Sequence, residues 1–351
     1  MATVSENKVH SISGNTFFKD FVFTDLVYRI KGTGDGELSD CIIYYNKTVL
    51  QIQVKERDVA RVQEAWFENK VKKKANNQHN AFDDTCKSGL DKVFVNNSGN
   101  SFKLSDFKDC TKYNITIFDN PDLEDYERIY IHKHKKDLEP YNIISLSDFN
   151  TICYYLMTPE SIVNYLKFRI SFLLSHKDDI FTEKQIISNY SEKFIRNHDI
   201  LKAYINEFRR FILNLTGNNN REDYRKLLSK IILFNTEEIF HITKRLVNIC
   251  TQRKNKKFDV FNYTFIKEFG ILFCATPFFD EAKNKEMLQC FSYCKKLDSA
   301  LVIEVCDVFE DGNLDIKLNY EEAPFEYCKD IKRKAERFEK TLHDQTTIFT
   351  F

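Results

Sequence analysis

The chain has little that breaks regular structure, because only nine glycines and five prolines occur among its 351 residues. Such a composition argues against long flexible linkers. Aromatic residues are abundant by contrast, with 32 phenylalanines and 17 tyrosines against a single tryptophan. A hydrophobic share of 42% and a charged share of 30% exclude a disordered chain. We therefore expect folded domains with an aromatic-rich interior.

The chain also lacks a net charge, since 52 lysines and arginines balance 52 aspartates and glutamates. No global field therefore attracts a nucleic acid or a membrane surface. Any polyanion site has to come from local basic patches, which occur at residues 70–74, 132–136, 253–257 and 329–340. Each patch is more often a solvated face than a binding surface.

Long apolar runs and paired cysteines are absent too. No apolar stretch approaches the length of a membrane span, and the first ten residues are polar. Ten cysteines are scattered without a CxxC pair, and Cys290 and Cys294 have no second pair or histidine cluster nearby. A zinc site is thus not expected. Reduced cysteines in apolar runs are typical of an intracellular protein, so we expect a cytoplasmic protein without membrane contact.

The pattern of the chain changes near residue 145. Alternating strand and helix patterns over 1–145 predict an α/β domain, and residues 146–351 predict a mainly helical α+β module for recognition of a partner or target. In the first part we expect a β-hairpin over 38–55, a helix over 58–77, and strands at 92–95, 113–118 and 128–133. In the second part we expect helices that begin at Ser147, Pro159, Thr182 and Asp199 or span 221–233 and 236–250. Towards the C-terminus we expect a strand over 263–275, a helix over 279–296, a hairpin that turns at Asp311–Gly312, and a basic helix over 324–342.

The hairpin determines which polar side chains meet. With Asn46 and Lys47 as the two turn residues, the strands pair so that Asp40 lies opposite Gln53. Alternate residues of a strand share a face, as do directly opposed residues of neighbouring strands. Asp40, Gln53 and Lys55 are therefore gathered on one side, and a shift of one residue in register would disperse them.

This trio suits phosphodiester cleavage. Asp40 supplies the carboxylate oxygen that Mg²⁺ or Mn²⁺ prefers, and Gln53 offers a weaker carbonyl oxygen. Lys55 can position or deprotonate the attacking water, or offset charge in the transition state. Glu37 lies close enough in sequence to be a second, weaker metal ligand. A surface-facing polar stripe on an amphipathic hairpin explains the same residues without chemistry.

At this point the sequence resembles a family. Residues 36–40 (GELSD), then twelve residues, then 53–55 (QVK) resemble the signature of the PD-(D/E)XK, or restriction-endonuclease-like, nuclease superfamily. That signature is an Asp on one strand and a Glu/Asp-x-Lys on the next, and the likeness covers about residues 15–135. The segment with Trp66 and Gln78 resembles one that carries an auxiliary Gln or Lys. Residues 145–162 are similar to a helix in bacterial proteins with a GKELCD…VK core.

The resemblance implies a mixed-sheet restriction-endonuclease-like core and a Mg²⁺-dependent DNA endonuclease in restriction or phage defence. A protein partner in a defence complex and a homo-oligomer both stay open. The basic residues that could follow a DNA backbone are Arg57, Arg61, Lys70 and Lys73.

Two departures from the family keep a second interpretation open. Gln53 replaces the usual acidic residue, and the family's glutamate on a helix before the hairpin has no clear equivalent. The region offers only Glu6, Asp20 and Asp25, none of which we expect in a helix. The alternative is a catalytically degenerate nuclease fold that acts as a nucleic-acid- or protein-binding subunit.

Overall fold

The computed structural model describes most of the chain, in two compact units. The units are Met1–His198 and Asp199–Phe351, so the boundary predicted at residue 145 falls inside the first unit. Among the described residues, no helix is both long and apolar enough to cross a bilayer. The described residues are 2–30, 34–57, 63–88, 92–123, 125–132, 140–177, 179–215, 221–255, 260–266, 269–276, 281–297, 299–307, 314–321 and 329–346.

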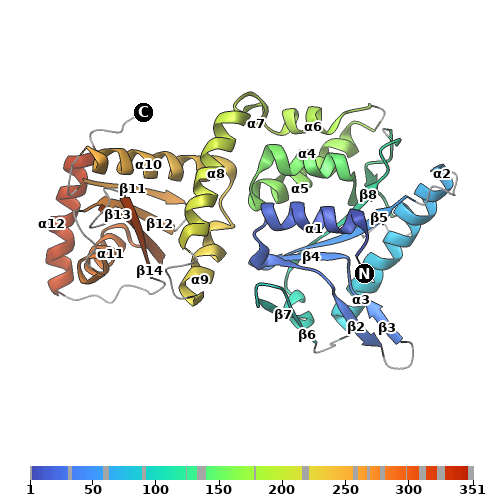
Figure 1. The fold of residues 1–351 in the computed structure, drawn as a ribbon, viewed down its shortest axis with the longest axis horizontal. Coiled ribbons are helices and arrows are strands. Elements are labelled where there is room, and N and C mark those ends of the chain that lie inside the picture. Colours follow the sequence, from blue (N-terminus) through green and yellow to red (C-terminus); the bar gives the residue numbers. More distant parts are fainter. Residues whose placement is uncertain are drawn as a thin grey trace. The chain divides into compact units, whose positions relative to one another are not determined.

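A six-stranded mixed sheet forms the centre of the first unit (Figure 1). Strands β5, β8 and β10 run parallel, whereas β1, β4 and β9 each pair antiparallel with a neighbour. The prediction of an α/β unit with a mixed sheet is confirmed. From one edge to the other the strands are β1 (Val22–Phe23), β4 (Cys41–Tyr45), β5 (Thr48–Glu56), β8 (Thr111–Asp119), β10 (Tyr141–Ser145) and β9 (Ile129–Tyr130).

The β4–β5 hairpin has the predicted register. Tyr45 pairs with Thr48 across the turn. Asn46 and Lys47 take φ angles of 39° and 59°, as a two-residue hairpin turn with right-handed strand twist requires. The first strand is shorter than predicted, because β4 begins at Cys41 and residues 34–37 pair with a different strand.

Helical segments cover both faces of this sheet. Phe118 of β8 contacts the ring of Trp66 on one side, while the carboxylate of the next residue, Asp119, is bound by Ser5 on the other. Because successive strand residues alternate, the segments that carry Trp66 and Ser5 lie on opposite faces. These segments are α2 (Gln63–Trp66), the π-helix η2 (Phe67–Lys74) and α3 (Ala75–Lys87) on the first face, and α1 (Val4–Thr16) on the second. The helix predicted from residue 58 is described only from residue 63.

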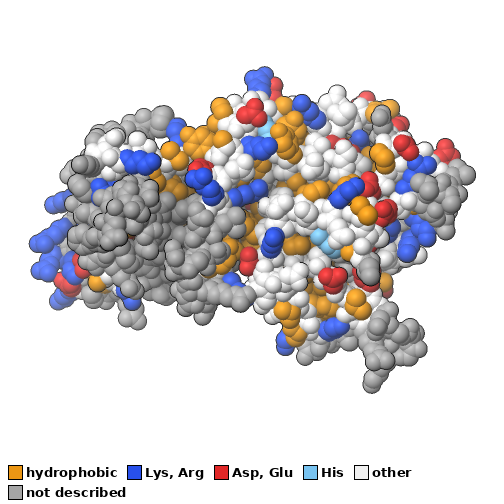
Figure 2. All heavy atoms as spheres, viewed as in Figure 1, with side chains coloured by type: hydrophobic (Ala, Val, Ile, Leu, Met, Phe, Trp, Pro, Cys, Tyr) orange, Lys and Arg blue, Asp and Glu red, His pale blue; other side chains and the backbone are white. Residues whose placement is uncertain are grey.

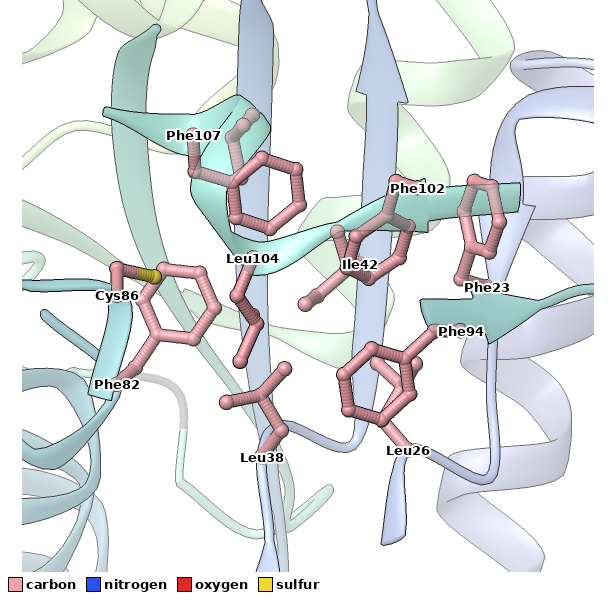
Figure 3. Packing of buried hydrophobic residues seen from close by; sticks show 11 residues of the cluster. Phe23, Leu26, Leu38, Ile42, Phe82, Cys86, Phe94, Phe102, Leu104 and Phe107 are labelled. Carbon is pink, nitrogen blue, oxygen red and sulfur yellow. The ribbon is translucent and has the colours of Figure 1, made fainter. Parts of the chain in front are cut away.

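An aromatic core lies between α3 and the start of the hairpin. Figure 3 shows Phe82 and Cys86 of α3 on one side of this cluster and Phe94 and Phe102 on the other. The rings of Phe102 and Phe107 stack at 4.6 Å between centroids, which accounts for part of the phenylalanine content. Short elements that frame the cluster are β2 (Val27–Ile30), β3 (Gly34–Glu37), β6 (Val93–Val95), β7 (Ser101–Lys103), and the 3-10 turns η1 (Lys19–Phe21) and η3 (Leu104–Phe107).

The helices that follow β10 belong to the first unit for a physical reason. The guanidinium of Arg169 in α5 is fully buried and binds both carboxylate oxygens of Glu183 in α6, at 2.9 and 3.1 Å. Arg169 also donates to the carbonyl of Ile143 in β10, so the ion pair joins both helices to the sheet. The predicted helix starts are confirmed to within one residue, because the helices begin at Leu146, Pro159 and Glu183 after the N-caps Ser145, Thr158 and Thr182. The helices are α4 (Leu146–Leu156), α5 (Pro159–Ser175), α6 (Glu183–Tyr190) and α7 (Glu192–Arg196).

The second unit packs helices on a four-stranded sheet in the order β11-β12-β13-β14. The single strand predicted over 263–275 is wrong, because this segment falls within two antiparallel strands. The predicted helix and final hairpin are present, although the turn at Asp311–Gly312 lies outside the described residues. The elements are α8 (His198–Leu215), α9 (Arg221–Ile231), α10 (Thr236–Lys254), β11 (Val260–Ile266), β12 (Phe269–Ala275), α11 (Glu281–Lys295), β13 (Ser299–Asp307), β14 (Leu314–Glu321) and α12 (Lys329–Thr346).

Candidate active site

The three hairpin residues with predicted chemistry lie together. The ammonium Nζ of Lys55 is 3.6 Å from Oδ2 of Asp40 and 3.4 Å from the amide oxygen Oε1 of Gln53. All three residues are buried, with exposed fractions of 6% for Asp40, 1% for Gln53 and 8% for Lys55. The register predicted from the sequence therefore brings Asp40, Gln53 and Lys55 together.

Asp40 is held from two sides at the position just before β4. Its Oδ2 accepts a hydrogen bond from the backbone N–H of Val54 at 2.5 Å, which satisfies a buried donor of β5. Its own carbonyl lies 2.9 Å from Nε2 of His10 in α1. The same Oδ2 forms the ion pair with Lys55, so this one oxygen links the strand backbone to the lysine.

Opposing effects act on the pKa of Lys55. Burial lowers the pKa of Lys55, and the positive charge of Lys74 lowers it further, whereas Asp40 and Glu6 raise it; the net shift is downwards. A lysine with a lowered pKa gives up its proton more readily than a solvated one. The pKa of Glu37 is raised, first by desolvation and then by the charges of Asp40 and Glu6. The charges of Asp40 and Glu6 thus act on Lys55, and the charge of Lys55 acts in turn on Glu37.

The expectation that Glu6 lies outside a helix is wrong. It lies in the first turn of α1, a helix that we did not expect, and its backbone N–H and carboxylate form a capping box with Thr3. The chain therefore does carry a glutamate on a helix before the hairpin, and its charge acts on both Glu37 and Lys55. Asp20 lies in the turn η1, and Asp25 takes a φ of 56° between β1 and β2.

The residues predicted to bind nucleic acid have separate surroundings. Arg57 donates to Asp122 at 2.5 Å and to Asn120 at 3.3 Å, so its charge is largely neutralised locally. Lys70 and Lys73 lie on η2, where Lys70 is partly buried and Lys73 is exposed. Arg61 lies outside the described residues. On the face of the first unit that Figure 2 shows, basic and acidic side chains are interspersed.

A buried polar group that the sequence did not reveal continues the site along β5. Nδ1 of His79 in α3 lies 2.7 Å from Oε1 of Gln51, and its Nε2 lies 3.1 Å from Oγ1 of Thr116. Burial, and then the charges of Lys55 and His132, lower the pKa of His79 to about 3, so the imidazole is neutral. This group joins α3 to the sheet, and only the single histidine at the end of an amphipathic helical pattern could have signalled it.

A cavity of about 750 Å³ lies beside the site, at the carboxyl ends of β8 and β10. Its walls include Phe118 and Asp119, which are the register partners of Lys55 and Glu56. In sheets with parallel strands, ligands commonly bind at this edge. The trio itself does not line the cavity.

The donors available for a metal are few but suitable. The described residues contain no cluster of three His, Cys, Asp or Glu side chains. Mg²⁺ usually keeps several waters and takes one or two carboxylates together with substrate phosphate oxygens. The carboxylate of Asp40 and the amide oxygen of Gln53 are oxygen donors of that kind, while Glu37 and Glu6 act on the site through their charges.

Comparisons of the chain with models of protein families, with curated proteins and with solved structures find no match.

Proposed function

We propose that the first unit is a metal-dependent nuclease that hydrolyses DNA phosphodiester bonds, with a restriction-endonuclease-like core. The observation that supports this best is the convergence of Asp40, Gln53 and Lys55 on one face of the hairpin, as the Asp…Gln-x-Lys pattern requires. A helix that carries Glu6 near the same site adds a second feature of that family.

Each residue has a role that its surroundings allow. Asp40 and Gln53 would hold the metal through oxygen, with Glu37 or Glu6 at the mouth of the site. A bound Mg²⁺ polarises a phosphoryl oxygen and lowers the pKa of water. Lys55, whose pKa is lowered by burial, can accept a proton from water or donate a hydrogen bond to a phosphate oxygen. Phosphate contacts from Lys70 and Lys73 would add a salt-dependent affinity.

The test is cleavage of supercoiled plasmid in Mg²⁺ or Mn²⁺. We expect nicking by the wild type and a loss of about 100-fold or more in Asp40→Ala and Lys55→Ala, since general acid–base and electrostatic groups each contribute on that order. Lys295→Ala and Glu339→Ala are matched controls, because they break a lysine–carboxylate pair of the second unit. The nuclease proposal fails if the wild type cleaves no faster than the site variants.

A second candidate function is favoured by one observation. The Asp40–Lys55 pair is buried, and the two residues do not line the cavity beside them. A degenerate fold that binds nucleic acid or a protein partner in a defence complex would keep such a closed pair. Gln53→Glu separates the two: added carboxylate charge should strengthen metal binding and cleavage in a nuclease, and it should leave a degenerate binder inactive.

A further inference from the structure

A second cavity, of about 640 Å³, lies at the opposite end of the parallel strands. It is bounded by the first residues of β8 and β10, by α3 and by α5, all of which belong to the first unit. Its size is within the range of sites for small molecules. The residues used below are Asp83, Lys112, Asn114, His132, Tyr141 and Lys167.

The charges of this cavity leave a positive excess. Lys112 is paired with Asp83 at 3.1 Å. Nζ of Lys167 has no ion-pair partner among the described residues and lies 5.5 Å from the centre of the Tyr113 ring. Two histidines line the cavity, the neutral His79 and His132. An anionic group would therefore be attracted to the Lys167 side of the cavity.

One residue of the cavity wall carries a polar atom without a partner. Oδ1 of Asn114, which lines the cavity, is buried without a hydrogen-bond partner among the described residues. A buried acceptor without a partner is costly, because it loses its hydration. A ligand group that donates a hydrogen bond to this oxygen would remove that cost.

Aromatic rings provide a third kind of wall. Tyr141 is buried and stacks on Tyr130 with 4.9 Å between ring centroids, and His132 lies edge-on to Tyr141 at 6.0 Å. Tyr113 also lines the cavity, and the ammonium of Lys167 lies over its ring. Rings of this kind favour a planar heteroaromatic group.

We propose that this cavity binds a nucleoside monophosphate. The phosphate contacts Lys167, the base lies among the rings of Tyr113, His132 and Tyr141, and an N–H group on the edge of the base donates to Oδ1 of Asn114. Nucleobases carry such N–H donors on their edges.

The cavity is separate from the candidate active site. Lys55 pairs with Phe118, four residues along β8 from Asn114, and a strand rises roughly 3.3 Å per residue, so the two sites are roughly 13 Å apart along the sheet. Nucleotide binding therefore does not depend on the proposed nuclease activity.

Calorimetric titration of the full chain with each 5′-monophosphate (AMP, GMP, CMP and UMP) tests the proposal. We expect at least one to bind with a Kd below about 1 mM, and adenosine and inorganic phosphate to bind at least about tenfold more weakly. A 5′-phosphorylated pentanucleotide distinguishes a free nucleotide from the end of a nucleic acid chain. If the pentanucleotide binds tightly and the mononucleotides do not, the assignment to a free nucleotide is wrong.

Two variants and one control locate the site. Lys167→Ala should weaken binding at least about tenfold, since a hydrogen bond to a charged group is lost. Lys167 is exposed, so this change does not threaten folding. Asn114→Leu should reduce discrimination between bases. Lys108→Ala, an exposed lysine outside the cavity, should change nothing. Absence of saturable binding, binding of phosphate alone, or equal affinity of wild type and Lys167→Ala would each overturn the proposal.

Discussion

Removal of the Asp40 carboxylate gives the sharpest test of how the site is held. In Asp40→Ala the Lys55 ammonium loses the partner at 3.6 Å, and the backbone N–H of Val54 loses its acceptor. Lys55 is only 8% exposed, so water cannot fully replace the carboxylate. Breaking a buried ion pair from one side costs about 3–5 kcal/mol, and an unsatisfied buried donor adds to that cost.

Removal of the lysine is expected to cost less. In Lys55→Met the stem of the side chain is kept approximately, and Asp40 still accepts the hydrogen bond from Val54. We expect a loss of about 1–3 kcal/mol, because one charged group loses one partner. The double variant Asp40→Ala/Lys55→Met should be more stable than the sum of the single changes predicts, by about 1 kcal/mol or more.

The chain offers a selective probe for this measurement. Trp66 is its only tryptophan, is 1% exposed, and packs on Phe118 in the first unit. Tryptophan fluorescence during urea unfolding therefore follows the first unit alone. Lys295→Ala, in the second unit, should leave the fluorescence transition unchanged. A loss below about 1 kcal/mol in Asp40→Ala would show that the pair is solvated and that the reasoning from burial is wrong.

Two further predictions concern the same unit and use the same fluorescence signal. His79 has a pKa of about 3 in the folded chain and about 6.5 when unfolded, so the unfolded state binds an extra proton as the pH falls below about 6.5. Its contribution to stability is thus fully present above that pH, and about 2 kcal/mol of it should be lost between pH 7 and pH 5. His79→Gln should remove this part of the loss. If the variant loses as much stability as the wild type, the assignment to His79 is wrong. Arg169→Met leaves Glu183, which is 2% exposed, without its main partner and should destabilise the unit by about 3–5 kcal/mol, with Arg196→Met as an exposed control; equal stability of the two variants would count against a structural role for this pair.

Local signals made part of the fold predictable. The hairpin register followed from a two-residue turn and the alternation of strand faces. The start of α5 followed from Thr158 as N-cap with Pro159 in the first position. In each case the information lies within a few residues of sequence, and no distant contact competes with it.

The missed elements lack such local signals. Helix α1 buries Ser5, Val9, Ser13 and Thr16, a stripe that is mostly small and polar, so its sequence shows no apolar period. Strand β10 has five residues and depends on pairing with β8, far away in the chain. The unit boundary at His198 depends on long-range contacts. One of them is the Arg169–Glu183 pair, which cannot be inferred from composition.

The residues of the candidate site also fall into a group that was predictable and a group that was not. Asp40, Gln53 and Lys55 lie on one hairpin, so strand geometry alone brought them together. The charge of Glu6 acts on the site from α1, and His79 contacts Gln51 from α3. The local sequence pattern predicts neither interaction. Residues from one supersecondary element were therefore predictable, and those delivered by other elements were not.

Gln53 has a further meaning once its burial is known. The ion pair between Asp40 and Lys55 is neutral overall, and Gln53 adds no charge at a position that is 1% exposed. A glutamate there would place a second negative charge beside Asp40 with a single ammonium to balance both, and buried charges without partners are costly. The amide thus lets the site stay folded and closed without a cation. In the proposed nuclease, its weaker donor oxygen would make metal binding depend more on a phosphate oxygen of the substrate, so the site would be complete only with DNA bound.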